Sequence, residues 1–316
     1  MPVIAVVIPY FQREPGLLAG ALRSVAAQDV DAELRVLVVD DGSPVPASEE
    51  LALTRDLALK VDVICQTNAG PGAARNAALD RIGHGADLVA FLDSDDRWRP
   101  SHLSRALTAL ASVADVYFSN LVHLGADAPA FERSGRIKDI AKTAIDAGSG
   151  LWCYDGDMLN QVAMGNLIGT PTVVYRQQRF AEHRFRPEFR RAGEDYLFWM
   201  GLAARQARFC FGTLATVDCG RGINVYSGAG WGTEGFARRL YDELLYRMAS
   251  ERDFELSEAA QAHVAAQKRA LSRAYGADLV HRVRHRLPVD WPLVASFWRR
   301  RPMWPFDTLL GLARPR

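Results

Sequence analysis

The sequence predicts an α/β protein with a mostly parallel central sheet, helices on both faces and a helical C-terminal extension. In the first hundred residues, short β-branched runs alternate with helical patterns, which is typical of βαβ units. Two of these runs end in acidic clusters, at the strand ends where such sheets bind ligands. The 316 residues are 49% apolar and 24% charged, as in an average globular protein, which argues against wholesale disorder and multi-span membrane architectures.

The elements of the first third are predicted from two patterns. Apolar runs of four to six residues predict buried strands, and apolar side chains at helical spacing predict the helices between them. A Gly-Pro-Gly turn at 70–72 marks the start of one helix. In order, the pattern predicts a strand at 3–8, a helix at 17–25, strands at 34–39 and 61–64, a helix at 73–82 and a strand at 88–92.

The remaining elements follow the same patterns, with two irregular stretches. Residues 125–165 lack a clear period, and such an insertion in a compact domain usually has a functional or binding role. Residues 220–235 hold six glycines, which is too flexible a composition for ordinary core. The sequence further predicts a helix from the cap Ser101 to 113, with His102 at the surface or as a cap, strands at 116–118, 173–175 and 209–217, and helices at 196–207, 236–252 and 257–286.

Charge divides the chain into two parts. The formal charge is only +1, but residues 268–316 hold 11 basic and 3 acidic residues, a net charge of +8. The rest of the chain, with 27 basic and 34 acidic residues, therefore carries −7. A strongly basic end on an acidic body predicts that the end has its own, anionic partner.

Cysteine usage and the apolar segments indicate a cytoplasmic location. The four cysteines are widely spaced, without a C-x-x-C pair, so neither a disulfide framework nor a zinc site is indicated. The apolar start is interrupted by Pro9 and lacks a basic leading region, so we expect a buried strand there rather than a signal peptide. Since no apolar run reaches about 18 residues, we expect no spanning helix.

Three polar motifs follow predicted strands. Asp93-Ser94-Asp95 offers two carboxylates that could hold a hard divalent cation, and such a cation can bridge two phosphate oxygens. In Asp40-Asp41-Gly42-Ser43 a carboxylate could accept a hydrogen bond from a base or a ribose hydroxyl. A glycine-containing turn then places Arg75 near a helix N-terminus, within reach of a nucleotide or phosphate. Each motif alone also suits a capped turn, but their order favours a nucleotide site.

In this order the motifs resemble those of family 2 glycosyltransferases with the GT-A nucleotide-sugar fold. The matching segments are VVIPYF at 6–11, VVDDGS at 38–43, GPGAARN at 70–76, FLDSDDRW at 91–98 and GED at 193–195. The resemblance spans about 3–235. It implies a Rossmann-like GT-A catalytic domain at 1–235, with a nucleotide-sugar half at 1–118 and an acceptor half at 119–235 that carries a mobile loop at 220–235, followed by an extension at 236–316.

The resemblance implies a nucleotide site and a metal site. Pro9 and Asp41 would line the nucleoside pocket with Asp40 alongside, and Arg75 would contact the nucleotide. For the metal site, the implied residues are Asp93, which would face the ribose or the metal, and Asp95, which would bind Mn²⁺ or Mg²⁺ directly.

The resemblance also assigns Asp195 as the general base, with Glu194 orienting it or the acceptor. The alternative is an acidic first turn that complements the helix dipole. Many relatives have a histidine in the glycine-rich loop, whereas no histidine occurs here between His183 and His263. The third metal ligand therefore stays open, and Arg221 is a candidate to stabilise the diphosphate instead.

The basic end combines arginines with tryptophans. Three of the chain's seven tryptophans lie between 291 and 304, among six arginines from 282 to 301. Tryptophan beside arginine suits a membrane interface, and four prolines keep any insertion short. We expect residues 282–316 to contact an anionic membrane surface; packing on the catalytic domain and homo-oligomer formation are alternatives, and nucleic acid is not expected because no recognition motif is present.

The main hypothesis is a metal-dependent inverting glycosyltransferase of hexosyl or N-acetylhexosaminyl type. It would transfer a sugar from a nucleotide sugar, expected to be a UDP-sugar, to a hydroxyl of a glycan or lipid-linked glycan in surface polysaccharide or glycoconjugate synthesis, at the inner face of the cell membrane. One alternative is a nucleotidyltransferase, although no glycine-rich triphosphate loop follows the first strand. Another is a catalytically silent glycan-binding or scaffold subunit.

Overall fold

A ten-stranded sheet forms the centre of the molecule. The computed structural model describes residues 1–111, 114–221, 229–305 and 307. The strand order is β3-β2-β1-β4-β9-β6-β10-β8-β7, and β5 pairs with β10. The strands are β1 (Val3–Tyr10), β2 (Glu33–Asp40), β3 (Lys60–Cys65), β4 (Leu88–Phe91), β5 (Arg97–Trp98), β6 (Val116–Val122), β7 (Lys142–Asp146), β8 (Leu151–Tyr154), β9 (Val174–Arg176) and β10 (Phe209–Asp218).

The sheet is mostly parallel, as the sequence predicts. Its longest ladders, β1–β2, β6–β10 and β2–β3, are parallel, and β4 also runs parallel to β1. The short strand β9 is antiparallel to both β4 and β6, so it joins the two parallel groups into one sheet. The carboxyl ends of β1, β2 and β4 therefore meet at one edge.

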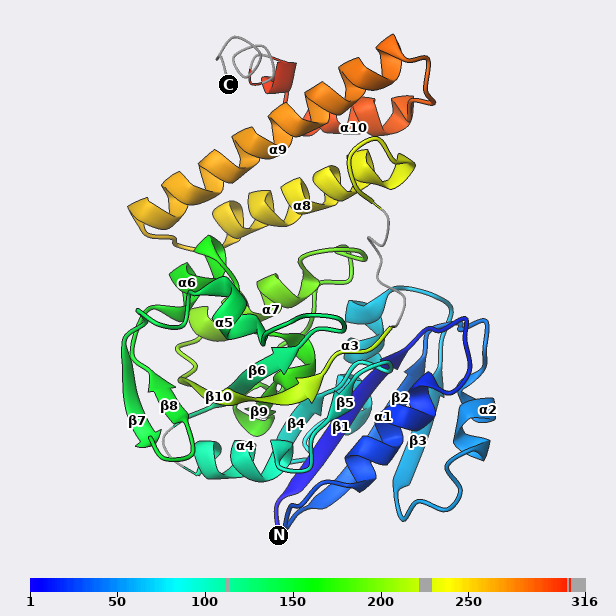
Figure 1. Ribbon diagram of the computed structural model, residues 1–316, viewed down its shortest axis with the longest axis vertical. Coiled ribbons are helices and arrows are strands. Elements are labelled where there is room, and N and C mark those ends of the chain that lie inside the picture. The colour runs from blue at the N-terminus through cyan, green and yellow to red at the C-terminus, as the bar shows by residue number, and fades with distance from the viewer. Residues whose placement is uncertain (112–113, 222–228, 306, 308–316) are drawn as a thin grey trace.

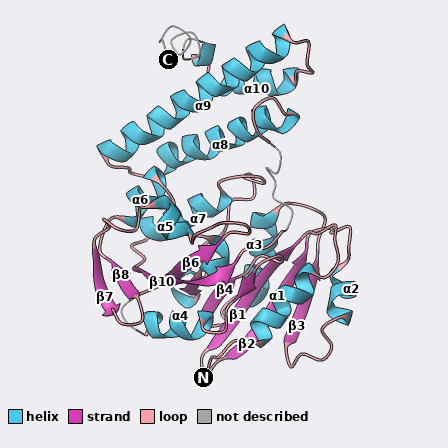
Figure 2. Ribbon diagram, in the orientation of Figure 1, coloured by secondary structure: helices cyan, strands magenta, loops and turns pink. Residues whose placement is uncertain are grey.

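Helices cover both faces of the sheet because the side chains of β1 alternate between them. Ile4, Val6 and Ile8 pack with α1 (Leu17–Ala26) and α4 (His102–Leu110) on one face. Ala5 and Val7 pack with α3 (Pro71–Ile82) and α7 (Glu194–Ala204) on the other. Figure 2 shows these layers around the strands. The smaller elements are α2 (Ala47–Ala52), α5 (Ala130–Ser134), α6 (Met158–Met164) and the 3₁₀ turns Thr170–Thr172 and Gln178–Phe180.

The predicted insertion at 125–165 is more regular than its sequence suggests. It contains α5, the antiparallel hairpin β7–β8 and α6, and β8 joins the central sheet beside β10. The hairpin escapes prediction because β7 is an edge strand with a mixed sequence, KTAID, and only partial burial.

The prediction of a surface or capping role for His102 is wrong. His102 is fully buried, its ring stacks 4.7 Å from that of Trp98, and its Nδ1 lies 2.8 Å from Thr216 Oγ1. Burial lowers the pKa of His102 to about 3, so the ring is neutral at physiological pH. The predicted end of this helix, at 113, lies outside the described residues.

Three helices form the helical extension, here α8 (Glu234–Asp253), α9 (Glu258–Arg284) and α10 (Trp291–Arg300). They lie together at the end of the molecule opposite the N-terminus (Figure 1). One end of the α8–α9 pair shares the core of the sheet domain, which runs from β1 to β10, through Tyr246, Ala249 and Leu256. The other end has a core of its own, made by Phe236, Leu240, Tyr241, Leu244, Leu271, Tyr275, Leu293, Phe297 and Trp304.

The helical character of the C-terminal part agrees with the sequence, and α10 shows how the prolines are accommodated. Pro292 lies in the first turn of α10, where a missing N–H leaves no hydrogen bond unmade. The division into domains at 235 stays a prediction, and α8 begins at Glu234. Within the described residues, no helix combines the length and the apolar character needed to cross a bilayer.

Candidate active site

A cleft of about 720 Å³ opens where β1, β2 and β4 end. It also borders the N-terminal ends of α3 and α7, so it collects residues far apart in the sequence. Six of the nine residues proposed from the sequence line it, namely Pro9, Asp41, Arg75, Asp93, Asp95 and Glu194. The other three proposed residues, Asp40, Asp195 and Arg221, belong to the described part of the chain but do not line the cleft.

The two aspartates at the end of β2 have different surroundings. Asp40 accepts hydrogen bonds from the backbone N–H groups of Ser43 and Ala47, both at 2.8 Å, so its carboxylate fixes the turn into α2. Asp41 is buried and accepts the N–H groups of Ala69 and Gly70 at 2.7 and 2.8 Å. Asp41 therefore holds the loop before α3 in place while it faces the cleft.

Arg75 joins the two acidic motifs of the cleft. Its side chain is only 4% exposed, its Nη2 donates to Asp93 Oδ1 at 2.7 Å, and its Nη1 lies 3.5 Å from Glu194 Oε1. The guanidinium also lies over the Phe185 ring, 5.3 Å from its centroid. Its Nε is buried without a hydrogen-bond partner among the described residues. The nucleotide contact expected of Arg75 stays a prediction, since the contacts shown are to the two carboxylates.

The Asp93-Ser94-Asp95 segment lines the cleft directly after β4. Among the described residues, no group of three or more histidine, cysteine, aspartate or glutamate side chains could hold a metal ion. Two carboxylates nevertheless suit Mg²⁺ or Mn²⁺, because such ions commonly take one or two protein carboxylates and complete their shell with substrate phosphates and water. The two carboxylates, Asp93 and Asp95, therefore suit a divalent cation that binds together with a diphosphate.

Asp96, the next residue, is buried and faces inward. Its Oδ1 accepts the backbone N–H of Gly220 at 2.9 Å, which fixes the start of the glycine-rich stretch beside the acidic motif. Burial, together with the charges of Asp93 and Asp95, raises the pKa of Asp96 to about 8. A Cβ on Gly220 would lie 1.8 Å from the Asp95 carbonyl oxygen, so only glycine fits there. Arg221 follows and is exposed; residues 222–228 of the predicted mobile loop lie outside the described residues.

The Glu194–Asp195 pair begins α7, and Glu194 lines the cleft next to Arg75. Burial and the neighbouring Asp195 carboxylate raise the pKa of Glu194 to about 7, although Arg75 opposes this shift. Burial also raises the pKa of Asp195, against the hydrogen bond that its Oδ1 accepts from the Tyr196 N–H at 2.8 Å. Raised carboxyl pKa values are typical of groups that exchange protons near neutral pH.

The helical extension reaches this pair through Tyr246 of α8. Gly193 precedes Glu194 with a φ of +87°, and a Cβ there would lie 2.2 Å from the Tyr246 Cβ. The Tyr246 ring also packs on Tyr196, with 5.1 Å between the centroids. The close approach requires glycine, so α8 directly supports the start of α7. No local sequence signal could have identified Tyr246, because it lies some 50 residues further along the chain.

Sequence reasoning also missed four polar side chains of the cleft. Gln12 is buried, and its Nε2 donates to Ser94 Oγ at 3.1 Å. Arg13, Arg190 and Arg191 line the cleft, and Arg190 donates to the backbone oxygen of Asn68 at 2.8 Å. Arg190 and Arg191 stand one residue before the Gly-Glu-Asp segment, and that proximity in the sequence was the available signal.

Solved structures share this architecture. The mannosyltransferase PcManGT of Pyrobaculum calidifontis, in complex with GDP-Man and Mn²⁺, matches with a TM-score of 0.58 at 17% identity, over 98% of this chain and 83% of that one. S. aureus TarS in complex with UDP-GlcNAc matches with a TM-score of 0.54 at 23% identity, over 86% of this chain and 72% of that one. The fold is thus that of the GT-A glycosyltransferases.

Sequence comparison identifies the family within this class. The model of "Glycosyl transferase family 2" matches residues 5–166. The succinoglycan biosynthesis protein ExoW of Rhizobium meliloti is 34% identical over 230 residues, which cover 72% of this chain and 71% of that protein. The chain belongs to glycosyl transferase family 2, as the motifs between β1 and α7 predicted, and it is a glycosyltransferase.

Proposed function

We propose that the protein transfers a hexosyl or N-acetylhexosaminyl group, with inversion, from a UDP-sugar to a hydroxyl of a glycan or lipid-linked glycan in surface polysaccharide or glycoconjugate synthesis. The observation that supports this proposal is the cleft itself, whose lining includes Asp41, Arg75, Asp93, Asp95 and Glu194. The similarity to a succinoglycan biosynthesis protein and to a fold solved with UDP-GlcNAc supports the same substrate classes.

In the donor half of the cleft, Asp41 and Pro9 would hold the nucleoside, with Asp40 fixing the turn behind them. Asp95 and Asp93 would hold Mn²⁺ or Mg²⁺, which supplies positive charge for the departing diphosphate. Arg75 keeps Asp93 in position, because its Nη2 already donates to that carboxylate. Arg221 lies next to Gly220, and we propose that it contacts the diphosphate from the glycine-rich loop.

On the acceptor side, a carboxylate must take the proton of the attacking hydroxyl. The acceptor oxygen forms a bond to the anomeric carbon, the bond from that carbon to the diphosphate oxygen breaks with its electron pair, and the proton passes to the carboxylate. We propose Asp195 as this base and Glu194 as the group that orients it. A specific observation favours the reverse assignment as the second candidate, since Glu194 lines the cleft and Asp195 does not.

Two variants distinguish these assignments. Asp195→Asn should lower the rate of UDP release from a UDP-sugar about 10²–10⁴-fold while UDP affinity changes by less than about threefold, because a base acts only in the chemical step. Glu194→Gln should cost less if Glu194 only orients its neighbour. Full activity of D195N together with loss of activity in E194Q would transfer the role to Glu194.

Donor identity and metal dependence can be tested by thermal shift. A panel of nucleotide sugars, each with and without Mn²⁺, should raise the melting temperature for UDP-sugars in the presence of the metal, since a ligand of the native state stabilises it. Asp95→Asn should abolish the metal-dependent part of the shift. Equal stabilisation by GDP-sugars, or no metal effect, would contradict the proposed donor or cofactor.

We also propose that the enzyme works in the cytoplasm at the inner face of the cell membrane. The support is the net charge of +8 in residues 268–316 and the tryptophans among its arginines. Residues 306 and 308–316 of the predicted contact region lie outside the described residues.

A further inference from the structure

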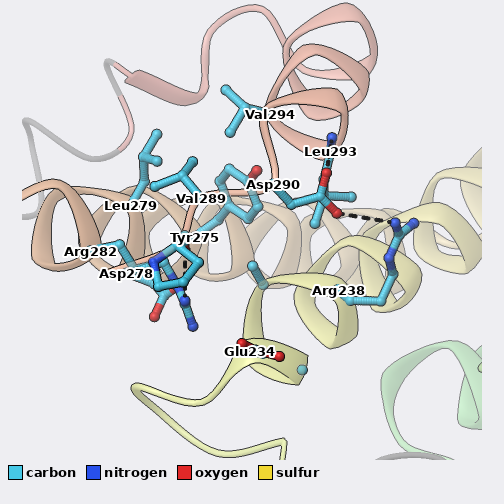
Figure 3. A pocket seen from close by; sticks show the side chains of 13 residues that line it. Glu234, Arg238, Tyr275, Asp278, Leu279, Arg282, Val289, Asp290, Leu293 and Val294 are labelled. Atoms are coloured by element: carbon cyan, nitrogen blue, oxygen red, sulfur yellow. Dashed lines mark hydrogen bonds and ion pairs between the residues drawn. The ribbon is translucent and has the colours of Figure 1, made fainter. Parts of the chain in front are cut away.

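The position of α10 on the helical extension is fixed from its inner side. Phe297 is fully buried, and its ring stacks on Tyr275 with 3.9 Å between the centroids. At the start of the helix, the Asp290 carboxylate accepts the N–H of Leu293 at 2.9 Å and lies 3.5 Å from Arg238 of α8 (Figure 3). These contacts set which face of α10 points inward and which points to solvent.

The outward face of α10 is apolar and, in the described part of the chain, mostly uncovered; Trp298 meets the Trp304 ring edge-on, with 6.3 Å between the centroids. Trp291, Ala295 and Trp298 follow one another at i, i+4 and i+7, so they share one stripe of the helix, opposite Leu293 and Phe297. Trp291 is 63% exposed and Trp298 is 51% exposed. Two exposed tryptophans on one helical stripe are unusual for a face that meets only water, because each exposes a large apolar area.

Arginines of this region divide into two groups. Arg300 and Arg301 turn toward the protein, where Arg300 lies 3.2 Å from the Tyr241 hydroxyl and Arg301 pairs with Asp307 at 3.0 Å. Arg284, Arg286 and Arg299 are exposed, and within the described residues they form no ion pair. Arg299 follows Trp298 directly, and the other two end α9 and begin the turn that leads to Trp291.

This combination of groups matches a lipid headgroup layer with negative charge. Tryptophan rings suit the boundary between acyl chains and headgroups, and unpaired arginines are attracted to anionic lipids. A second copy of the same face would bring these arginines against one another, so self-association through it is disfavoured. Nucleic acid would use the charges but would give the apolar stripe no role.

We propose that the outer face of α10, meaning Trp291, Ala295 and Trp298 with the flanking Arg284, Arg286 and Arg299, docks the protein on an anionic lipid bilayer. The helix lies in the plane of the surface, with its tryptophan rings among the headgroups and its inner face still on α8 and α9. The proposal rests on the proposed location at a membrane, but it does not depend on the chemistry of the cleft.

Vesicle flotation of the full-length chain tests this surface. The chain should float with phosphatidylcholine vesicles that contain about 30% of the anionic lipid phosphatidylglycerol. With vesicles of phosphatidylcholine alone it should remain in the bottom fraction. Each arginine removed should weaken binding about fivefold, so R284Q/R286Q/R299Q should bind roughly a hundredfold less tightly. W291S/W298S should also lose most binding while its charge is unchanged.

The matched control removes the same charge elsewhere. R55Q/R81Q/K138Q changes three exposed cations of the sheet domain and should float like the unchanged chain. Loss of flotation in this control, or undiminished flotation of both surface variants, would overturn the assignment to this face. Light scattering that shows a dimer dissolved by W291S/W298S would also overturn it, in favour of a second copy as the occupant.

The same variants separate this proposal from the enzymatic one. UDP-sugar stabilisation in the thermal-shift assay should be unchanged in the surface variants, because none of the substituted residues lines the cleft. Variants that lose flotation but keep donor binding support the docking surface alone. If the unchanged chain binds donor but no vesicle, the docking surface is wrong and the glycosyltransferase assignment stands.

Discussion

Charged side chains face inward at the cleft of the sheet domain and outward on the far end of the helical extension. Arg75 and Glu194 are buried and paired. The Asp41 carboxylate accepts hydrogen bonds from backbone N–H groups of the loop before α3 and so holds that loop in place. Arg284 and Arg299 instead extend into solvent without an ion pair in the described part of the chain. Under the two proposals above, the first set is preorganised for a small charged ligand, whereas the second set is exposed for contact with a broad surface.

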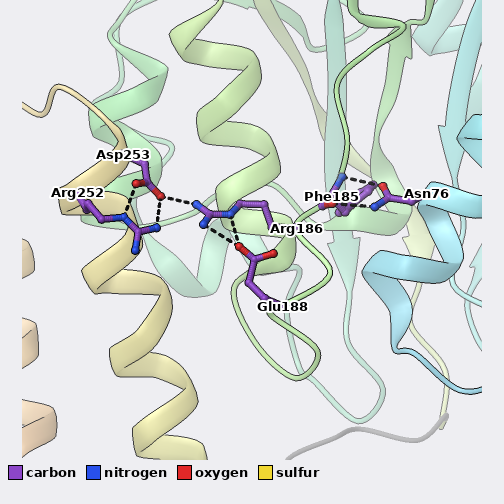
Figure 4. A network of polar contacts seen from close by, with 6 residues as sticks. All are labelled: Asn76, Phe185, Arg186, Glu188, Arg252 and Asp253. Carbon is purple, nitrogen blue, oxygen red and sulfur yellow. Dashed lines mark hydrogen bonds and ion pairs between the residues drawn. The ribbon is translucent and has the colours of Figure 1, made fainter. Parts of the chain in front are cut away.

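The two regions are nevertheless packed together where the proposed base lies. Tyr246 of α8 fills the space beside Gly193, and the C-terminal end of α8 joins a polar chain that reaches α3. In that chain, Asn76 exchanges two hydrogen bonds with the backbone of Phe185, and the next residue, Arg186, pairs with Asp253 (Figure 4). The extension is therefore a structural support of the site as well as a candidate docking surface.

Removing Arg75 should have the largest effect on the inward-facing set. Arg75→Met leaves Asp93 and the buried Glu194 without their shared cation, so we expect a loss of about 3 kcal/mol in the free energy of unfolding and loss of UDP release. Arg75→Lys keeps the positive charge but lacks the two guanidinium nitrogens that contact Asp93 and Glu194, so it should recover part of the lost stability. Urea denaturation measures both, and wild-type stability of R75M would show that the pair of carboxylates needs no cation.

The titration of Glu194 gives the second effect. Its pKa is raised to about 7, so the carboxyl is protonated below that pH in the folded protein and ionised above it. If an ionised Glu194 is required beside Asp195, the rate of UDP release should fall about tenfold per pH unit below about pH 7. The rate of UDP release by E194Q should be lower than that of the wild type at high pH and should not change with pH around 7. A wild-type profile that is level down to pH 5 would remove Glu194 from the proton-transfer step.

How much the sequence could predict differs between the regions for physical reasons. Short motifs at strand ends, such as those of Asp41 and Asp95, are local, and parallel strands bring them to one edge, so the cleft was foreseeable. The bridge made by Arg75 was not, because it joins residues 119 positions apart whose packing depends on Phe185 and Gly72. His102 shows the same limit, since only the tertiary fold places its ring between Trp98 and Thr216.

In the extension, composition predicted a basic and aromatic surface but could not distinguish its members. Phe297, Trp298 and Trp304 look equivalent in the sequence, yet Phe297 and Trp304 are buried and Trp298 is exposed. Helical phase, fixed by the Asp290 cap and by the Tyr275–Phe297 stack, makes the distinction. Composition therefore pointed to the segment, whereas only the packing shows which of its aromatic side chains are exposed.

The ion pair between Arg186 and Asp253 should give the smallest effect and shows how the two regions are joined. Both side chains are about a quarter exposed, at 27% and 28%, and each has a second ionic partner, Glu188 and Arg252 respectively. A double-mutant cycle with R186M and D253N should therefore give a coupling energy of only about 0.5 kcal/mol in the free energy of unfolding.

The hydrogen bonds from Arg252 and Arg186 lower the pKa of Asp253 to about 2, so the coupling should persist at pH 5 and disappear only as the pH falls toward 2. UDP affinity should be unchanged in all three variants, because neither Arg186 nor Asp253 lines the cleft and the start of α7 packs on Tyr246 independently of this pair. A coupling above about 2 kcal/mol, or a parallel loss of UDP affinity, would instead make the polar chain from Asn76 to Asp253 the main connection between the cleft and the extension.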